Sequence, residues 1–164
     1  MQVMRTAAAL LALVLGGGCL DAGSGYLTGK TAPYVRNTSP DMGNLVRRGD
    51  YLEGTGNDTL APNGQIVVTF SKAMNATPSL LAAGIVVCCV PGTSNNVPLV
   101  APTPQPGQLQ ETPETGDVPF TVITSANPPL AGNAQYTLIL KTLLQDVSGT
   151  PLRTEVRVPF STTP

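Results

Sequence analysis

Hydrophobic and polar residues alternate with a period of two in four segments between residues 65 and 160. Successive side chains of a strand point to opposite faces, so this alternation predicts strands with one buried face. The expected inward residues are Ile66, Val68 and Phe70; Val118, Phe120 and Val122; Tyr136, Leu138 and Leu140; and Val156, Val158 and Phe160. Clusters of turn-forming residues, such as 63–64 and 127–133, separate the segments and indicate short connections between strands.

The remaining apolar segments complete the pattern of a turn-rich β protein. The run 85–90 is apolar throughout, which is typical of a buried strand, and 97–101 is expected to pair with it as a hairpin. Residues 77–83 fit a short helical turn. Because Pro159 has no backbone N–H, the last strand should lie at a sheet edge there or end nearby. Together the segments predict an all-β, antiparallel β-sandwich of about seven strands.

The composition excludes several classes of function. The 164 residues include 17 glycines and 16 prolines, only 12% of them are charged, and the net charge is −1. Because no basic patch is present to neutralise phosphates, we predict no nucleic-acid partner. The chain contains no histidine, which removes imidazole-based catalytic triads and His-liganded metal sites. We therefore predict that the protein is not an enzyme and holds no cofactor or metal.

Residues 1–18 have the organisation of a signal peptide. Arg5 supplies a positive start, 7–15 are uninterrupted apolar residues, and three glycines precede Cys19. The apolar run is too short to span a bilayer, which needs about 20 residues. A cysteine directly after small residues resembles the lipobox of bacterial lipoproteins, although glycine stands three residues before the cysteine, where leucine is usual. The resemblance implies a lipid on Cys19, and the alternative is ordinary secretory cleavage near Gly18 or Ala22.

The rest of the chain divides into a tether and one domain. Residues 19–59 are rich in small polar residues and have no sustained period, which predicts a lipidated cysteine and a flexible tether. A first strand could fall within it, at 45–46 or 51–52. The folded domain is predicted over 60–164. Within the domain, 97–119 contains six prolines and three acidic residues, and we favour a disordered or polyproline-like loop that offers a contact surface.

Four short motifs lie in order along the predicted domain. They are Thr69-Phe70-Ser71-Lys72-Ala73-Met74-Asn75; Pro129-Leu130-Ala131-Gly132 with Tyr136-Thr137-Leu138; Asp146-Val147-Ser148-Gly149 with Leu152; and Phe160-Ser161-Thr162. In order and spacing they resemble the motifs of SbsA-type bacterial Ig-like domains over about residues 60–164. The resemblance implies an immunoglobulin-like sandwich. It also implies a spacer or adhesive role, because such domains usually serve as repeats in larger surface proteins.

Three residues acquire structural roles in this interpretation. Tyr136 opens a strand where Ig-like sandwiches often carry a tyrosine whose hydroxyl bonds to the backbone, and a plain core tyrosine is the alternative. Asp146 is expected to hold an Asx-type turn before the last strand, with Gly149 in the same turn. A calcium-binding role for Asp146 is less favoured, because no second carboxylate lies close to it in sequence.

Cys88 and Cys89 are adjacent within the apolar run. Neighbouring residues of a strand point to opposite faces, so both cannot lie in one core layer. Three states are open: a reduced pair with one buried thiol, a disulfide between the neighbours, and a cross-link from the outward cysteine to a partner. The first two are favoured. Two thiols without a histidine or further cysteine supply only half of a zinc site.

These observations favour a non-catalytic lipoprotein of the cell envelope. Cys19 would attach the protein to a membrane, and other envelope proteins would be its partners. Leu20 stands where an aspartate would mark retention in the inner membrane, which favours the outer membrane. A carbohydrate- or metal-binding module is the alternative. The small number of aromatic residues and the absence of histidine argue against it.

Overall fold

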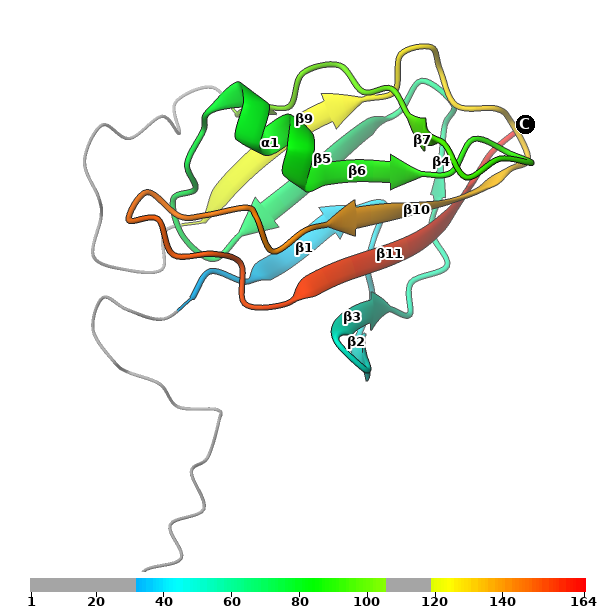
Figure 1. Cartoon of the computed structure of the whole chain (residues 1–164). Helices are drawn as coiled ribbons and strands as arrows, with labels where there is room; N and C mark the ends of the chain where they lie inside the picture. The colour runs from blue at the N-terminus through cyan, green and yellow to red at the C-terminus, as the bar shows by residue number, and fades with distance from the viewer. Residues whose placement is uncertain (1–31, 106–118) are drawn as a thin grey trace, which may run out of the picture.

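The computed structural model describes residues 32–105 and 119–164, which form two sheets packed as a sandwich (Figure 1). The smaller sheet has the order β1 (Val35–Ser39), β5 (Gln65–Phe70), β9 (Phe120–Ser125) and β8 (Thr103–Pro104). The larger sheet has the order β2 (Leu45–Arg48), β3 (Tyr51–Gly54), β11 (Glu155–Thr162), β10 (Gln135–Leu140), β6 (Ile85–Cys88) and β7 (Asn96–Val97), with β4 (Thr59–Leu60) also beside β11. The all-β sandwich is confirmed. The described residues contain 11 strands, more than the seven expected, since two-residue strands leave no periodic pattern.

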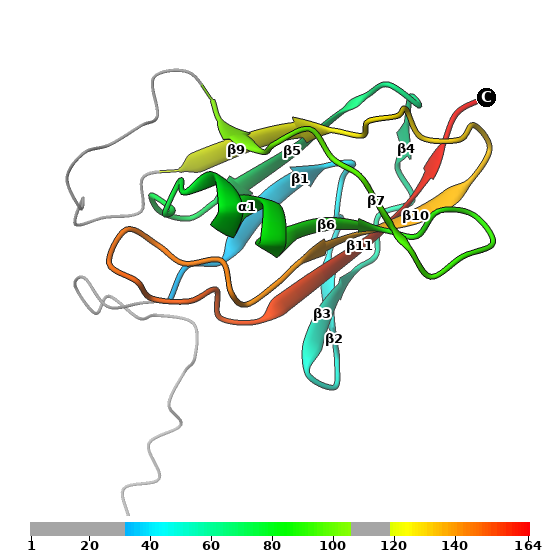
Figure 2. The same ribbon diagram turned by 45° about the horizontal axis from the view of Figure 1, so that its top comes forward.

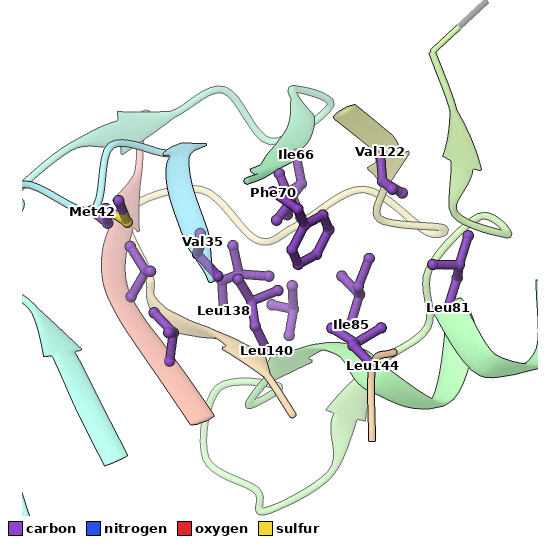
Figure 3. Packing of buried hydrophobic residues seen from close by; sticks show 14 of the residues in the cluster. Val35, Met42, Ile66, Phe70, Leu81, Ile85, Val122, Leu138, Leu140 and Leu144 are labelled. Atoms are coloured by element: carbon purple, nitrogen blue, oxygen red, sulfur yellow. The ribbon is translucent and has the colours of Figure 1, made fainter. Parts of the chain in front are cut away.

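The core lies between the sheets and follows the period-two pattern of the sequence. Inward residues of β5, β9, β10 and β11 are buried, and the residues between them are half-buried or exposed. Figure 3 shows side chains from both sheets, including Phe70 and Leu138, meeting in one cluster. Phe70 and Leu138 are each fully buried, and burying a side chain of this size contributes about 1.5–3 kcal/mol.

A single short helix, α1 (Pro78–Gly84), is present among the described residues and leads directly into β6 (Figure 2). Its proline stands in the first turn, where the missing N–H costs no hydrogen bond. Leu81 is buried, and a Cβ at Gly84 would overlap the Leu144 side chain, so the helix packs closely against the loop after β10. The predicted helical turn at 77–83 is therefore confirmed within one residue.

The folded domain begins earlier than residue 60. Four strands, β1 to β4, lie at least partly within the segment 19–59 that the sequence pattern assigned to a tether. β1 pairs with β5, and the β2–β3 hairpin joins the larger sheet through parallel pairing of β3 with β11. Burial along β1 does not alternate, because the register shifts between Val35 and Asn37. The predicted signal peptide and Cys19 lie outside the described residues.

The segment 97–119 is partly paired, which corrects the expectation of an irregular loop. β7 pairs with β6 and forms the hairpin that the sequence predicts. The chain then crosses to the other sheet, where β8 pairs with β9. Pro104 is tolerated in β8 because β8 is an edge strand. Residues 106–118, with the acidic part of the predicted loop, lie outside the described residues.

Pro159 does lie at a local edge, although β11 continues past it to Thr162. On one side Pro159 pairs with Thr137 of β10. On the other side β3 pairs only as far as Arg157 and β4 only from Ser161. The missing N–H of proline therefore falls where no ladder partner requires it.

Candidate functional site

Pro159 lies in a groove on the outward face of the larger sheet. Val87, Leu138 and Val158 are fully buried, and their neighbours along each strand point the opposite way. Pairing of Thr137 with both Cys88 and Pro159 places these three residues in one outward row. The row forms the floor of the groove, and each of its members is half-buried.

The β6–β7 connection forms the first wall. β6 ends at Cys88, Pro91 follows in the connection, and Gly92 adopts a φ of +77°, a conformation that favours glycine. Thr93 fixes the turn, because its backbone N–H and its hydroxyl both donate to the Val90 carbonyl, at 2.9 and 3.0 Å. The turn holds Val90 at the rim of the groove, where it is 37% exposed.

The β3–β4 connection forms the opposite wall. The Asp58 carboxylate accepts hydrogen bonds from the backbone N–H groups of Asp41 and Thr59, each at 2.8 Å. Gly56 donates to the Met42 carbonyl at 3.0 Å, and a Cβ at Gly56 would overlap the Asp41 carbonyl oxygen. This wall is therefore fixed by close backbone contacts, and the Asp58 carboxylate is already used in holding it.

The resulting groove has a volume of about 460 Å³. Its lining includes Cys88 and Cys89 beside the uncharged side chains of Asn57, Gln135 and Thr137. A disulfide joins the two cysteines, which are both half-buried. The structure thus places the cysteine pair singled out in the sequence on an accessible surface and not inside the core. Asp58 is the one charged side chain among the described lining residues, and the rest of the lining is uncharged.

Tyr136 lies next to the groove but points into the core. Its hydroxyl accepts a hydrogen bond from the Ala131 N–H at 2.9 Å, and its ring stacks on Phe160 with centroids 5.7 Å apart. The residue is only 4% exposed, so water has little access to its hydroxyl and this bond supplies a partner in its place. This is the geometry of a tyrosine that fixes the corner before its strand.

Asp146 and Gly149 lie beyond the opposite end of β10, away from the groove. Asp146 Oδ1 accepts from the N–H of Ser148 and the N–H of Thr150, both at 2.9 Å, and from the Ser148 hydroxyl at 2.6 Å. Its Oδ2 lies 3.9 Å from Lys72 Nζ. Gly149 has a φ of +83°. These contacts form an Asx turn, and no cluster of three or more metal-ligating residues exists in the part of the chain that the structure describes.

A second groove, of about 300 Å³, lies between the edge strands β1 and β2. Its floor is apolar, and its lining includes Val35, Leu45, Leu52, Leu152 and Val156. Sequence patterns gave no signal for it, because its residues come from three distant segments.

The mouth of this second groove carries an aromatic ring and two cations. Tyr34 is 48% exposed, and Arg47 and Arg153 are both exposed. Neither arginine makes an ion pair with a carboxylate in residues 32–105 or 119–164. The groove therefore combines an apolar floor with uncompensated positive charge.

Arg157, in β11 of the larger sheet, has a pKa that departs from its ordinary value. Its Nε and a terminal guanidinium nitrogen each lie 2.7 Å from Glu155 Oε1, and its guanidinium lies 4.0 Å from the centroid of the Tyr51 ring. The hydrogen bond to Glu155 raises the pKa of Arg157 above its ordinary value. Arg157 therefore stays protonated and is unsuited to proton transfer.

Comparison with known proteins identifies a related family and two similar structures. The model of a family described as bacterial Ig-like domain matches residues 29–162. The crystal structure of the S-layer protein rSbsC(31-844) is similar, with 14% identity and a TM-score of 0.44 over 81% of this chain and 14% of that chain. The crystal structure of the N-terminal part of the bacterial S-layer protein SbsC has 14% identity and a TM-score of 0.42 over 80% of this chain and 24% of that chain. No curated protein matches the chain in sequence.

Proposed function

Because the chain belongs to the family of bacterial Ig-like domains, we propose that it is a non-catalytic cell-envelope lipoprotein whose sandwich is a structural and protein-interaction module. This family is typically non-catalytic. The anchor is proposed from the sequence, in which a charged start, an apolar run and small residues precede Cys19. No helix in the described residues is long and apolar enough to cross a membrane.

The open edge of β2 is the observation that carries the interaction role. The Thr55 N–H donates to the Asn44 carbonyl at 2.9 Å, which defines one hydrogen-bonded pair of the hairpin. Such pairs alternate along an antiparallel ladder, so the backbone groups of Leu45 and Arg47 point away from β3. β2 ends the order of its sheet, and in both views the hairpin extends away from the sandwich (Figures 1 and 2).

An extended polypeptide segment with carboxylate side chains fits this edge. Its backbone would pair with Leu45 and Arg47, and its alternate apolar side chains would enter the floor of the second groove. Its carboxylates would meet Arg47 and Arg153, whose guanidinium groups bind carboxylates with two hydrogen bonds. The partner is therefore proposed to be an envelope protein that presents an acidic, extended strand.

The lipid anchor is tested by the intact mass of the protein extracted from membranes of its native host. We expect a chain that begins at Cys19 and carries acyl groups. More than one acyl chain would give stable attachment, since each buried methylene contributes about 0.8 kcal/mol. A chain without lipid that begins near Gly18 or Ala22 would contradict the anchor.

The interaction role is tested by placing a photo-crosslinking amino acid at Val46 in intact cells. Val46 is exposed on β2, and we expect one discrete cross-linked product whose peptide is acidic and extended. The double variant Arg47→Glu with Arg153→Glu should abolish the product, whereas Lys141→Glu, away from the groove, should not. Cross-linking that is insensitive to the double variant would contradict the proposed surface.

A further inference from the structure

The disulfide between Cys88 and Cys89 cannot stabilise the fold in the usual way. A disulfide stabilises mainly by restricting the unfolded chain, and its effect grows with the length of the loop that it closes. The two cysteines are adjacent in the chain, so this bond closes no loop of intervening residues. Any role of this bond therefore depends on its reactivity and on the residues around it.

Those surroundings are accessible to solvent. Both cysteines line the first groove and are half-buried, whereas Val87, one position earlier, is fully buried. Sulfurs inside a core are inert, and disulfides that a thiolate can reach are the labile and regulatory ones. Asp58 is the one charged side chain among the described residues of the groove lining, and both of its carboxylate oxygens accept hydrogen bonds from backbone N–H groups.

From this placement we propose that the groove is a thiol–disulfide exchange site, in which Cys88 and Cys89 react with the thiol of an incoming molecule. This role goes beyond the proposed interaction module and uses a different surface. The attacking group is a thiolate carried by a small molecule or by a protein cysteine. The accessible groove excludes neither source, and the experiment below distinguishes them.

The exchange is balanced without a further oxidant. A thiolate attacks one of the two sulfurs and forms a mixed disulfide, while the bond between Cys88 and Cys89 breaks and the other sulfur leaves as a thiolate that takes up a proton. A second thiolate then attacks the mixed disulfide at the sulfur of the incoming group. The incoming molecules leave as a disulfide, and the two cysteines are left as thiols. Two electrons pass from the incoming thiols to the protein.

The test uses the full chain with Cys19→Ala, because Cys88 and Cys89 are then its only cysteines. The oxidised protein is incubated with glutathione at a series of reduced-to-oxidised ratios. Its free thiols are then blocked with a maleimide, and the intact mass is measured by mass spectrometry. We expect a reversible transition between no adduct and two adducts. The rate in the native protein should lie within about tenfold of the rate in urea, because the groove already exposes the sulfurs. Each single variant, Cys88→Ser and Cys89→Ser, should retain one glutathione.

Two matched variants test the groove itself. Val90 and Val147 are each 37% exposed, but only Val90 is at the groove. We expect Val90→Trp to slow native exchange about tenfold by covering the sulfurs and Val147→Trp to leave the rate unchanged. Faster reduction by thioredoxin than by glutathione at equal thiol concentration would assign the site to protein thiols, and the reverse would assign it to small thiols. Exchange seen only in urea, or cysteines that stay reduced in excess oxidised glutathione, would overturn the proposal.

Discussion

The Tyr136 hydroxyl distinguishes a corner residue from a plain core tyrosine. Tyr136→Phe keeps the ring on Phe160 but leaves the Ala131 N–H without its acceptor. We expect the free energy of unfolding to fall by about 0.5–1.5 kcal/mol, the net contribution of one intramolecular hydrogen bond. Urea denaturation measures it, and Tyr34→Phe, at an exposed site, should change stability by less than about 0.5 kcal/mol. Equal effects of the two substitutions would favour the plain core residue.

Asp146 carries the second prediction at this scale. Asp146→Ala removes the acceptor of three hydrogen bonds and the carboxylate beside Lys72. We expect a loss of about 2–4 kcal/mol, because the Ser148 and Thr150 N–H groups lose their acceptor together. Ser148→Ala removes only the hydroxyl donor and should cost about 1 kcal/mol. If addition of calcium ions raised the melting temperature of the unaltered protein but not of the Asp146→Ala variant, Asp146 would be a metal ligand and not a turn residue.

Among the elements, β10 and β11 show how the position of a proline decides its cost. Thr137 in β10 has neighbours on both sides, Cys88 and Pro159, whereas Pro159 has one. We expect Thr137→Pro to cost about 3 kcal/mol or more, since it removes a donor inside the sheet and adds steric conflict. Pro159→Ala should change stability by less than about 1 kcal/mol. Thermal unfolding of both variants checks the contrast, and a large loss for Pro159→Ala would show that the local edge is not open.

The strands that could be predicted from sequence are those that carry their own pattern. In β5, β10 and β11 the burial alternates residue by residue, so hydrophobicity alone reveals them. β2 could not be found this way, because its residues 45–48 run from half-buried to exposed and its place depends on pairing through β3 with a strand about 100 residues later. Register and parallel pairing are set by distant contacts, which a local period does not record.

The candidate site likewise has a part that the sequence reveals and a part that depends on distant contacts. Cys88 and Cys89 are conspicuous in the sequence, but strand alternation, which predicts opposite faces for them, does not extend to Cys89. β6 ends at Cys88, and both cysteines line the same groove. The walls of their groove could not be predicted, because Gly56 and Asp58 come from a connection about 30 residues earlier and are held by bonds to the segment before β2. A motif can therefore mark a reactive residue while the surrounding fold decides what reaches it.

At the scale of the whole molecule, the position of the domain boundary has a measurable consequence. β1 covers the outer edge of β5, and the β2–β3 hairpin covers one side of β11. A chain that begins at Leu60 would lack β1, β2 and β3 and would leave the inward side chains Phe70 and Val156 without part of their cover. A chain that begins at Ala32 would keep every strand of the described residues.

We expect the chain from Ala32 to unfold in one cooperative transition with the urea midpoint of the full chain, since each described contact of the sandwich lies within it. The chain from Leu60 should lose that transition and bind a hydrophobic dye, because β1, β2 and β3 and the burial that they provide are removed together. Circular dichroism with urea titration measures both. Cooperative unfolding of the shorter chain at an unchanged midpoint would show that residues 32–59 are an appendage, as a flexible tether requires, and that the hairpin carries no share of the stability. The open β2 edge would then be a separable arm and not part of the sandwich, and its partner would bind it without any effect on the folding of the rest.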